Sequence, residues 1–214
     1  MRSRSFVLSV FVLCAILIAP ATAFAQGATF GVEGGINVAN VSFSAGDSSE
    51  PTPDFKSKTR GVFGIFMARD FNPKAGLQVD VLYSQKGTKA TVTDGVNKFT
   101  FEASVDYIEI PVLIRGNIGG SGSMRVRVFA GPSFGFKVAH DTETTFNGVV
   151  VPDEEDEEFT NYDIGFVIGG AVQFGKAFVD VRYNWGFVNV ATDDGSGDEV
   201  KTRTLGVMVG FRFK

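Results

Sequence analysis

The sequence is poor in the residues on which metal centres and covalent catalysis depend. Its 214 residues include one cysteine and one histidine, too few for a zinc cluster or a disulfide framework. The single histidine, His140, has no Ser or Asp partner at a recognisable spacing, which disfavours the acid–base chemistry of hydrolases and acyltransferases. We therefore expect neither enzyme activity nor a cofactor.

Long apolar runs are also missing beyond the N-terminus. After the first 25 residues, no segment approaches the ~20 apolar residues that a membrane-spanning helix needs. What the sequence has in excess is glycine and phenylalanine. Gly accounts for 26 of the 214 residues, about 12% against a usual ~7%. The 22 Phe far outnumber the four Tyr and one Trp.

The first 25 residues have the pattern of a secretory signal peptide. Two arginines give a basic start, residues 6–19 form an apolar run, and Ala-Phe-Ala at 23–25 has the small-x-small form of a cleavage site. We expect residues 1–25 to be removed, leaving one domain over residues 26–214. That domain keeps 18 of the 20 basic residues against 24 acidic ones, a formal charge of −6. Such a balance gives no reason to expect nucleic acid as a partner.

Apolar and polar residues alternate with a period of two along this domain, which is typical of half-buried β-strands. Eight such segments can be counted, and residues 108–115 and 205–213 are clear examples. Every second connection between them is short. The long connections are expected at 42–58, 88–97, 139–159 and 188–201, and the short ones at 70–74, 118–123 and 175–176. This spacing predicts a consecutive antiparallel meander.

The alternation alone fits two barrels that differ in which face is inside. In a soluble barrel the Phe, Val and Ile face would form the core, whereas in a membrane barrel it would meet lipid. Glycines such as Gly31, Gly169 and Gly210 fall on the polar face, where a crowded lumen needs small residues beside long charged ones. The short turns, the long loops and the signal peptide favour the membrane barrel as well. We predict an all-β, eight-stranded antiparallel up-and-down transmembrane barrel in the cell outer membrane.

Closure of the barrel has a physical reason, because an open strand edge in hydrocarbon leaves unpaired backbone groups at several kcal/mol each. With the apolar face outward, amphipathic aromatic rings toward the long-loop ends are expected to form an interface girdle. These rings are Tyr83, Tyr107, Tyr162, Tyr183 and Trp185.

Charged residues on the polar face are expected to point into the lumen. They are Glu33, Asp80, Glu109, Arg115, Arg125, Arg127, Asp180, Arg182 and Arg212. Because unpaired charges there would be costly, we expect them to form a network that plugs the lumen. We predict that Glu109 pairs with an arginine of a neighbouring strand. A structural polar core is favoured over a proton or ion path.

Three places disturb the simple pattern. Pro132 lies within a strand that should be paired on both sides, although proline lacks a donor. Between Asp106 and Ile108 the apolar residues of the sequence pass from odd to even positions. Both places are candidate β-bulges, which add one residue and reverse the facing, or the register is off by one there. Residues 60–69 are apolar on both faces, so their phase is open.

An acidic run lies in the longest predicted loop. It consists of Asp153, Glu154, Glu155, Asp156, Glu157 and Glu158. The run could bind Ca²⁺ or a basic partner, but it lacks the Asp-x-Asp-x-Asp-Gly spacing of a calcium loop. Residues 193–198 are slightly closer to such a pattern. A solvated outer loop without a metal is the favoured interpretation.

Several short motifs resemble the PorT-like family of outer-membrane β-barrels, a group of OmpA/OmpX-like barrels. They are Gly-Leu-Gln at 76–78, Tyr-Ser-Gln-Lys-Gly at 83–87, Tyr-Ile-Glu-Ile-Pro-Val at 107–112, Gly-Pro-Ser-Phe-Gly-Phe at 131–136 and Arg-Tyr-Asn at 182–184. In that family a Pro often follows the Leu-Gln pair, where this chain has Val79 and Asp80. The resemblance implies the fold and the compartment. PorT itself belongs to a secretion and gliding apparatus, a role that these motifs do not specify.

Together these observations predict a non-enzymatic, monomeric outer-membrane protein in contact with lipid. Its lumen would be plugged by side chains, and its role would be structural or would lie in presenting outer loops to a protein partner. A PorT-like subunit of a secretion apparatus and a small narrow pore remain the alternatives.

Overall fold

The computed structural model describes residues 27–44, 54–94, 97–151, 160–189 and 199–213. The predicted signal peptide, the acidic run at 153–158 and the acidic residues at 193–198 lie outside the described residues. The described chain forms nine β-strands. They are β1 (Thr29–Ser44), β2 (Asp54–Asp70), β3 (Ala75–Asp94), β4 (Asn97–Gly119), β5 (Met124–Phe146), β6 (Val149–Val151), β7 (Tyr162–Phe174), β8 (Ala177–Asn189) and β9 (Glu199–Arg212).

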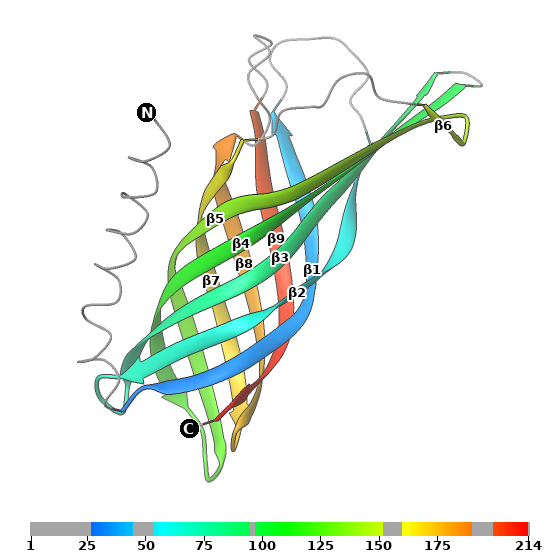
Figure 1. Cartoon of the computed structure of the whole chain (residues 1–214). Helices are drawn as coiled ribbons and strands as arrows, with labels where there is room; N and C mark the ends of the chain where they lie inside the picture. The colour runs from blue at the N-terminus through cyan, green and yellow to red at the C-terminus, as the bar shows by residue number, and fades with distance from the viewer. Residues whose placement is uncertain (1–26, 45–53, 95–96, 152–159, 190–198, 214) are drawn as a thin grey trace, which may run out of the picture.

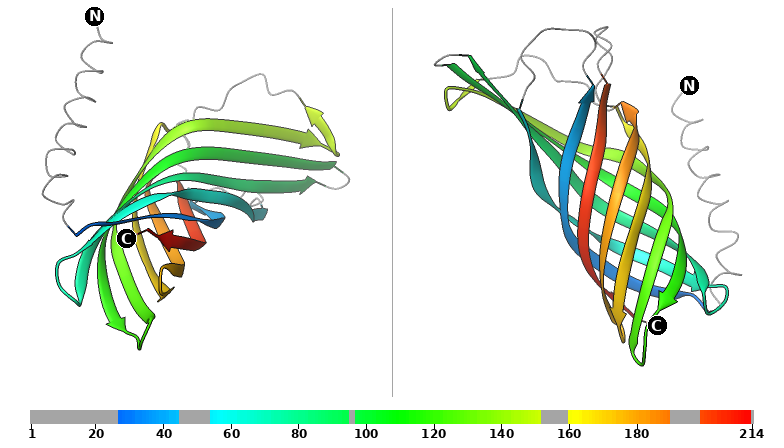
Figure 2. Two further views of the ribbon diagram at one scale, coloured as in Figure 1. Left: turned by 60° about the horizontal axis from the view of Figure 1, so that its bottom comes forward. Right: turned by 180° about the vertical axis from the view of Figure 1, so that it is seen from behind.

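Eight of these strands close into a ring. Each pairs antiparallel with its neighbour in sequence order, apart from the short β6, and the ring closes where β1 pairs with β9. β6 pairs only with the outer end of β5. Figures 1 and 2 show the tilted barrel, with the C-terminus at the end that carries the short turns. The prediction of an eight-stranded antiparallel up-and-down barrel is confirmed.

The strands present apolar side chains outward and polar ones inward. On β7, Ile164, Phe166 and Ile168 are exposed, whereas Asp163 and Val167, at the alternate positions, are buried. Such an outer surface is unsuited to water and matches hydrocarbon. The structure therefore has the predicted orientation, with the apolar face of the strands outward and the polar face toward the lumen.

β2 carries the segment whose phase the sequence left open. Phe63 and Ile65 are about 60% exposed on the outer face, whereas Val62, Phe66 and Ala68 are buried inside the barrel. Both faces of β2 are apolar because part of the lumen is itself apolar. Three small clusters of buried apolar side chains fill it: Val62 with Leu82 and Met208, Phe66 with Ala68 and Phe178, and Leu113 with Phe129 and Val167.

The prediction of a long loop at 88–97 is wrong, because most of this segment is strand: β3 runs to Asp94 and β4 begins at Asn97. Likewise, much of the predicted loop at 139–159 belongs to β5 and β6. β5 turns into β6 at Asn147 and Gly148, whose φ values of 50° and 83° are those of a tight two-residue hairpin turn. Strands β3, β4, β5 and β6 thus form an outer sheet that continues beyond the barrel (Figure 1).

Neither suspected bulge is present, at Pro132 or between Asp106 and Ile108 of β4. Pro132 pairs in register with Phe166 of β7, and the β4–β5 register is unchanged across it. On β4, Val105, Tyr107 and Glu109 all face inward, so the phase does not switch between Asp106 and Ile108. The register does shift at this level, but the extra residue belongs to β5, where pairing passes from Lys137 to Ala139.

Candidate functional site

The centre of the barrel interior holds one arginine among three carboxylates. Arg182 Nη1 lies 3.1 Å from Asp80 Oδ2, and its Nη2 lies 3.2 Å from Glu33 Oε2 and 2.6 Å from Asp180 Oδ2. All four side chains are at most 7% exposed. The guanidinium also faces an aromatic ring, because Arg182 Cζ lies 5.5 Å from the centroid of the Phe129 ring. A charge-dense cluster of this kind, removed from water, holds its members in one geometry.

A second charged cluster lies nearer the long-loop end. Lys86 Nζ is 2.6 Å from Glu109 Oε1 and 3.2 Å from Asp163 Oδ2, and it lies 5.1 Å from the centroid of the Tyr107 ring. The neighbouring-strand partner of Glu109 is therefore a lysine, and the prediction of an arginine is wrong. Lys86 reaches Glu109 diagonally, because the residue directly opposite Glu109 on β3 is Leu82.

The remaining predicted lumen residues gather at the short-turn end. Arg115, Arg127 and Arg212 are buried there, on β4, β5 and β9. Arg125 is exposed at the end of β5. The structure thus separates the lumen charges along the barrel axis, with carboxylates in excess at the centre and guanidinium groups in excess at one end.

Little free space remains between these clusters. The central cavity, which Glu109, Arg182 and Met208 line with their neighbours, measures about 20 Å³. That volume is enough for about one water molecule.

Sequence reasoning missed three inward aromatic rings and the glycines that receive them. A Cβ atom added to Gly31, Gly169 or Gly210 would come within 2.5 Å of the ring of Phe66, Phe129 or Phe178, respectively. These glycines make room mainly for aromatic rings rather than for charged chains as expected. On β5 and β8 the signal was present, because Phe129 and Phe178 share the phase of Arg127 and Asp180.

The structure places the predicted girdle residues on both faces of the barrel wall. Tyr162 is exposed, and the partly exposed rings of Tyr183 and Trp185 pack edge-on with centroids 4.5 Å apart. Tyr83 donates a hydrogen bond to Asp106. Tyr107, in contrast, is 1% exposed and points inward, because β4 does not switch phase before it. Its placement in the girdle is wrong.

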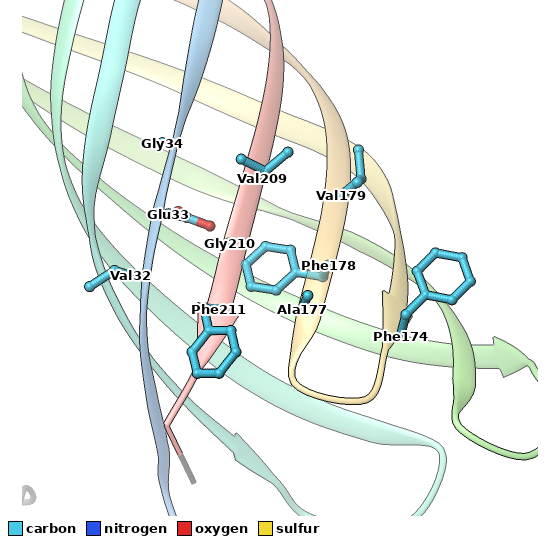
Figure 3. Close-up of a pocket in the computed structure, with 10 residues that line it drawn as sticks. All are labelled: Val32, Glu33, Gly34, Phe174, Ala177, Phe178, Val179, Val209, Gly210 and Phe211. Atoms are coloured by element: carbon cyan, nitrogen blue, oxygen red, sulfur yellow. The ribbon is translucent and has the colours of Figure 1, made fainter.

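The outer wall has a shallow apolar groove at the short-turn end, across β1, β8 and β9 (Figure 3). Val32, Val209 and Phe211 line its sides, and Gly210 forms part of its floor with the Phe178 ring behind it. The groove measures about 500 Å³. Its lining matches the hydrocarbon chain of a lipid, so the groove belongs to the lipid-facing surface.

A third ion cluster joins β2 to strands β3 and β4 of the outer sheet. Lys58 Nζ and Lys89 Nζ each lie 2.6 Å from a carboxylate oxygen of Glu102. Hydrogen bonds from Lys58 and then Lys89 lower the pKa of Glu102 from 4.5 to about 2. Glu102 lies beyond Tyr107 toward the outer end of β4, outside the membrane-spanning part.

This pKa shift predicts a pH-dependent outer sheet. Because the pKa of Glu102 is lowered in the folded state, its pairing stabilises the sheet above pH 4.5 and is lost as the pH falls through about 2. As the pH is lowered from 4.5 to about 2, amide protection factors should therefore fall in the outer part of β4, before Tyr107 in sequence, and in the part of β3 that pairs with it. In a Glu102→Gln variant the same amides should show a flat profile. Equal profiles for the two proteins would contradict the assignment.

The described ranges hold neither a metal-binding group of side chains nor a membrane-spanning helix. Within them, no group of three or more His, Cys, Asp or Glu side chains could hold a metal ion. The same residues form no helix that is long and apolar enough to cross a membrane. His140 is exposed on β5.

A closed β-barrel with an apolar outer wall and a charged, packed interior defines an integral protein of the outer membrane. The chain belongs to the outer membrane protein beta-barrel domain family, which matches residues 24–192. The outer membrane is accordingly its location. No curated protein matches it in sequence.

Three solved structures illustrate the likeness. The outer membrane protein OprG from Pseudomonas aeruginosa is 12% identical, with 87% of this chain and 96% of OprG covered and a TM-score of 0.52. Neisserial surface protein A is 14% identical, covering 87% and 99%, with a TM-score of 0.44. Ail, the attachment invasion locus protein of Yersinia pestis, is 14% identical, covering 86% and 98%, with a TM-score of 0.41. At this identity the likeness to OprG concerns the fold alone.

Proposed function

We propose that this chain is a non-enzymatic, monomeric outer-membrane barrel with a plugged lumen, which presents its outer sheet to a protein partner. Residues 1–25 act as the signal peptide in this proposal. The observation that carries it is the packed interior. The Arg182 cluster, the Lys86 cluster and three apolar clusters all lie in the lumen. The cavity between them, about 20 Å³, supports a plug because it is too small for a hydrated ion.

Conductance in a planar bilayer tests the plug. The full barrel, reconstituted beside a porin that proves the bilayer is competent, should give no stable openings. Persistent single-channel steps would instead support the small-pore alternative and overturn the plugged lumen.

The outer sheet supports a role in binding a partner. At its end, Val149, Val150 and Val151 of β6 are 68%, 59% and 42% exposed, and β6 pairs with the outer end of β5, beyond the barrel wall. An exposed edge strand with apolar side chains is suited to pairing with an extended segment of another protein. A PorT-like subunit of a secretion apparatus would be one case of such a role.

Site-specific photo-crosslinking in intact cells tests this part. A photoreactive residue in place of Val150 should give a defined protein adduct. The same residue in place of Phe63, which is 60% exposed on the lipid-facing wall, should not. Identical adducts at both positions would argue against a partner at the outer sheet, and an adduct with components of a secretion apparatus would favour the PorT-like role.

A further inference from the structure

Four arginines converge at the short-turn end of the lumen. Arg115, Arg127 and Arg212 are 3%, 6% and 8% exposed, and Arg125 is exposed beside them. Arg212, Arg115 and Arg125 lie close enough to repel the charge of Arg127, and Asp70 lies close enough to attract it. Arg115 and Arg125 likewise repel Arg212. These side chains form the arginine cluster.

The cluster is short of negative charge. Arg115 Nη2 lies 2.7 Å from Asp70 Oδ1, and among the described residues this is the one ion pair that the cluster makes. Its other hydrogen bonds go to neutral oxygens. These are Arg115 to Gln78 at 3.3 Å, Arg127 to Asn117 at 3.1 Å, and Arg212 to Gln173 at 2.8 Å and to Thr29 at 2.9 Å. Four positive charges therefore face one carboxylate in direct contact.

Two donors of the cluster also lack acceptors. Nη2 of Arg127 and Nε of Arg115 are buried and have no hydrogen-bond partner within the described ranges. A buried donor on a charged group is costly to leave unsatisfied. The other two charged clusters of the lumen do the opposite, because each places two or three carboxylates around a single cation. An anion from outside the chain would supply what the arginine cluster lacks.

The cluster is reachable from the short-turn end. A polar hollow of about 430 Å³ lies between the β2–β3 and β4–β5 turns, and Asp70, Asn117 and Arg125 line it. Asp70 and Asn117 are the residues that hydrogen-bond Arg115 and Arg127. Short turns of outer-membrane barrels face the periplasm, so a solute would arrive from that side.

We propose that the arginine cluster is a binding site for a phosphate group, open to the periplasm. Guanidinium groups match phosphate oxygens with paired, charge-assisted hydrogen bonds. A doubly charged tetrahedral oxyanion can accept bonds from several arginines at once, which a halide cannot do with the same geometry. Free phosphate and the phosphate of a lipid headgroup share this chemistry.

Calorimetric titration of inorganic phosphate into the full barrel, folded in an uncharged maltoside detergent, tests the site. At constant ionic strength, phosphate should bind and raise the midpoint of urea unfolding above that in chloride. Arg127→Gln should weaken binding at least tenfold. Arg125→Gln should weaken it too, and because Arg125 is exposed this variant keeps the test valid if the first does not fold. Lys176→Gln, which removes a charge from the β7–β8 turn at the same end, should change neither quantity.

A second arm separates the two sources of phosphate. In bilayers of phosphatidylglycerol and phosphate-free buffer, a headgroup ligand would make the wild-type barrel more stable than Arg127→Gln and insensitive to added phosphate. A free-phosphate ligand would leave the wild type responsive to added phosphate in those bilayers. The proposal is overturned if two results occur together. Phosphate in detergent would shift the urea midpoint no more than chloride does, and in the bilayer the wild type would be neither more stable than Arg127→Gln nor responsive to added phosphate. It is also overturned if Arg127→Gln and Lys176→Gln behave alike.

Discussion

Replacing Arg182 by glutamine is expected to lower the free energy of unfolding by about 3–5 kcal/mol, the range found when one partner of a buried ion pair is removed. The variant would leave Glu33, Asp80 and Asp180 facing one another without a cation. Asp80 is fully buried, so water cannot replace the lost contacts. Urea unfolding in lipid vesicles, followed by the fluorescence of the single tryptophan Trp185, measures the loss.

Two companions make this result specific. Lys98→Gln removes one positive charge from an exposed position on β4 and should change stability by no more than about 0.5 kcal/mol. Asp180→Asn in the Arg182→Gln background should recover part of the loss, because it removes one of the uncompensated charges. A loss in Arg182→Gln no larger than in Lys98→Gln would show that the cluster contributes little to stability.

The second large effect is steric. A Cβ atom at Gly35, on the inner face of β1, would lie 2.0 Å from the carbonyl oxygen of Val207 and 2.7 Å from the Cα of Met208. Both obstacles are backbone of the paired strand β9, so relief requires the two strands to separate. Gly35→Ala should therefore destabilise the barrel by about 1–3 kcal/mol, the usual cost of overpacking. The same vesicle unfolding assay measures it.

The adjacent Gly34 provides the matched control. It faces outward, and a Cβ atom there would meet its nearest neighbour, Phe63, at 3.4 Å, an ordinary van der Waals contact. Gly34→Ala should thus leave stability within about 0.5 kcal/mol of the wild type. If the two variants were equally destabilised, a general glycine effect on strand formation would explain both better than the close approach to β9.

The sequence carried enough information for the wall of the barrel. Where a strand has one apolar and one polar face, as β7 and β9 do, the period of two determines which side chains meet lipid. It failed for β2, because an interior that is partly apolar removes the contrast between the faces. It also failed for Tyr107. Tyrosine is common at membrane interfaces, but Tyr107 lies on the same inward face of β4 as Glu109.

Pairings across the lumen were beyond reach for a different reason. They depend on the stagger between strands, which no single strand encodes. Lys86 contacts Glu109 although Leu82 is opposite it, and it also contacts Asp163 from across the ring. The outer sheet was missed because its strands are rich in Thr, Lys, Asp and Glu, so their composition resembles that of a loop.

The length of β4 sets how far a bound partner would stand from the cell. At about 3.3 Å per residue, its 23 residues extend for about 75 Å, well over the ~30 Å of a bilayer core even after tilting. β3 and β4 keep one pairing register over this length, from Ala75 opposite Gly116 to Asp94 opposite Asn97, although the β4–β5 register shifts by one residue near Tyr107. A pull exerted on the tip would consequently be transmitted straight into the wall, and the embedded cylinder would serve as a stiff mechanical anchor.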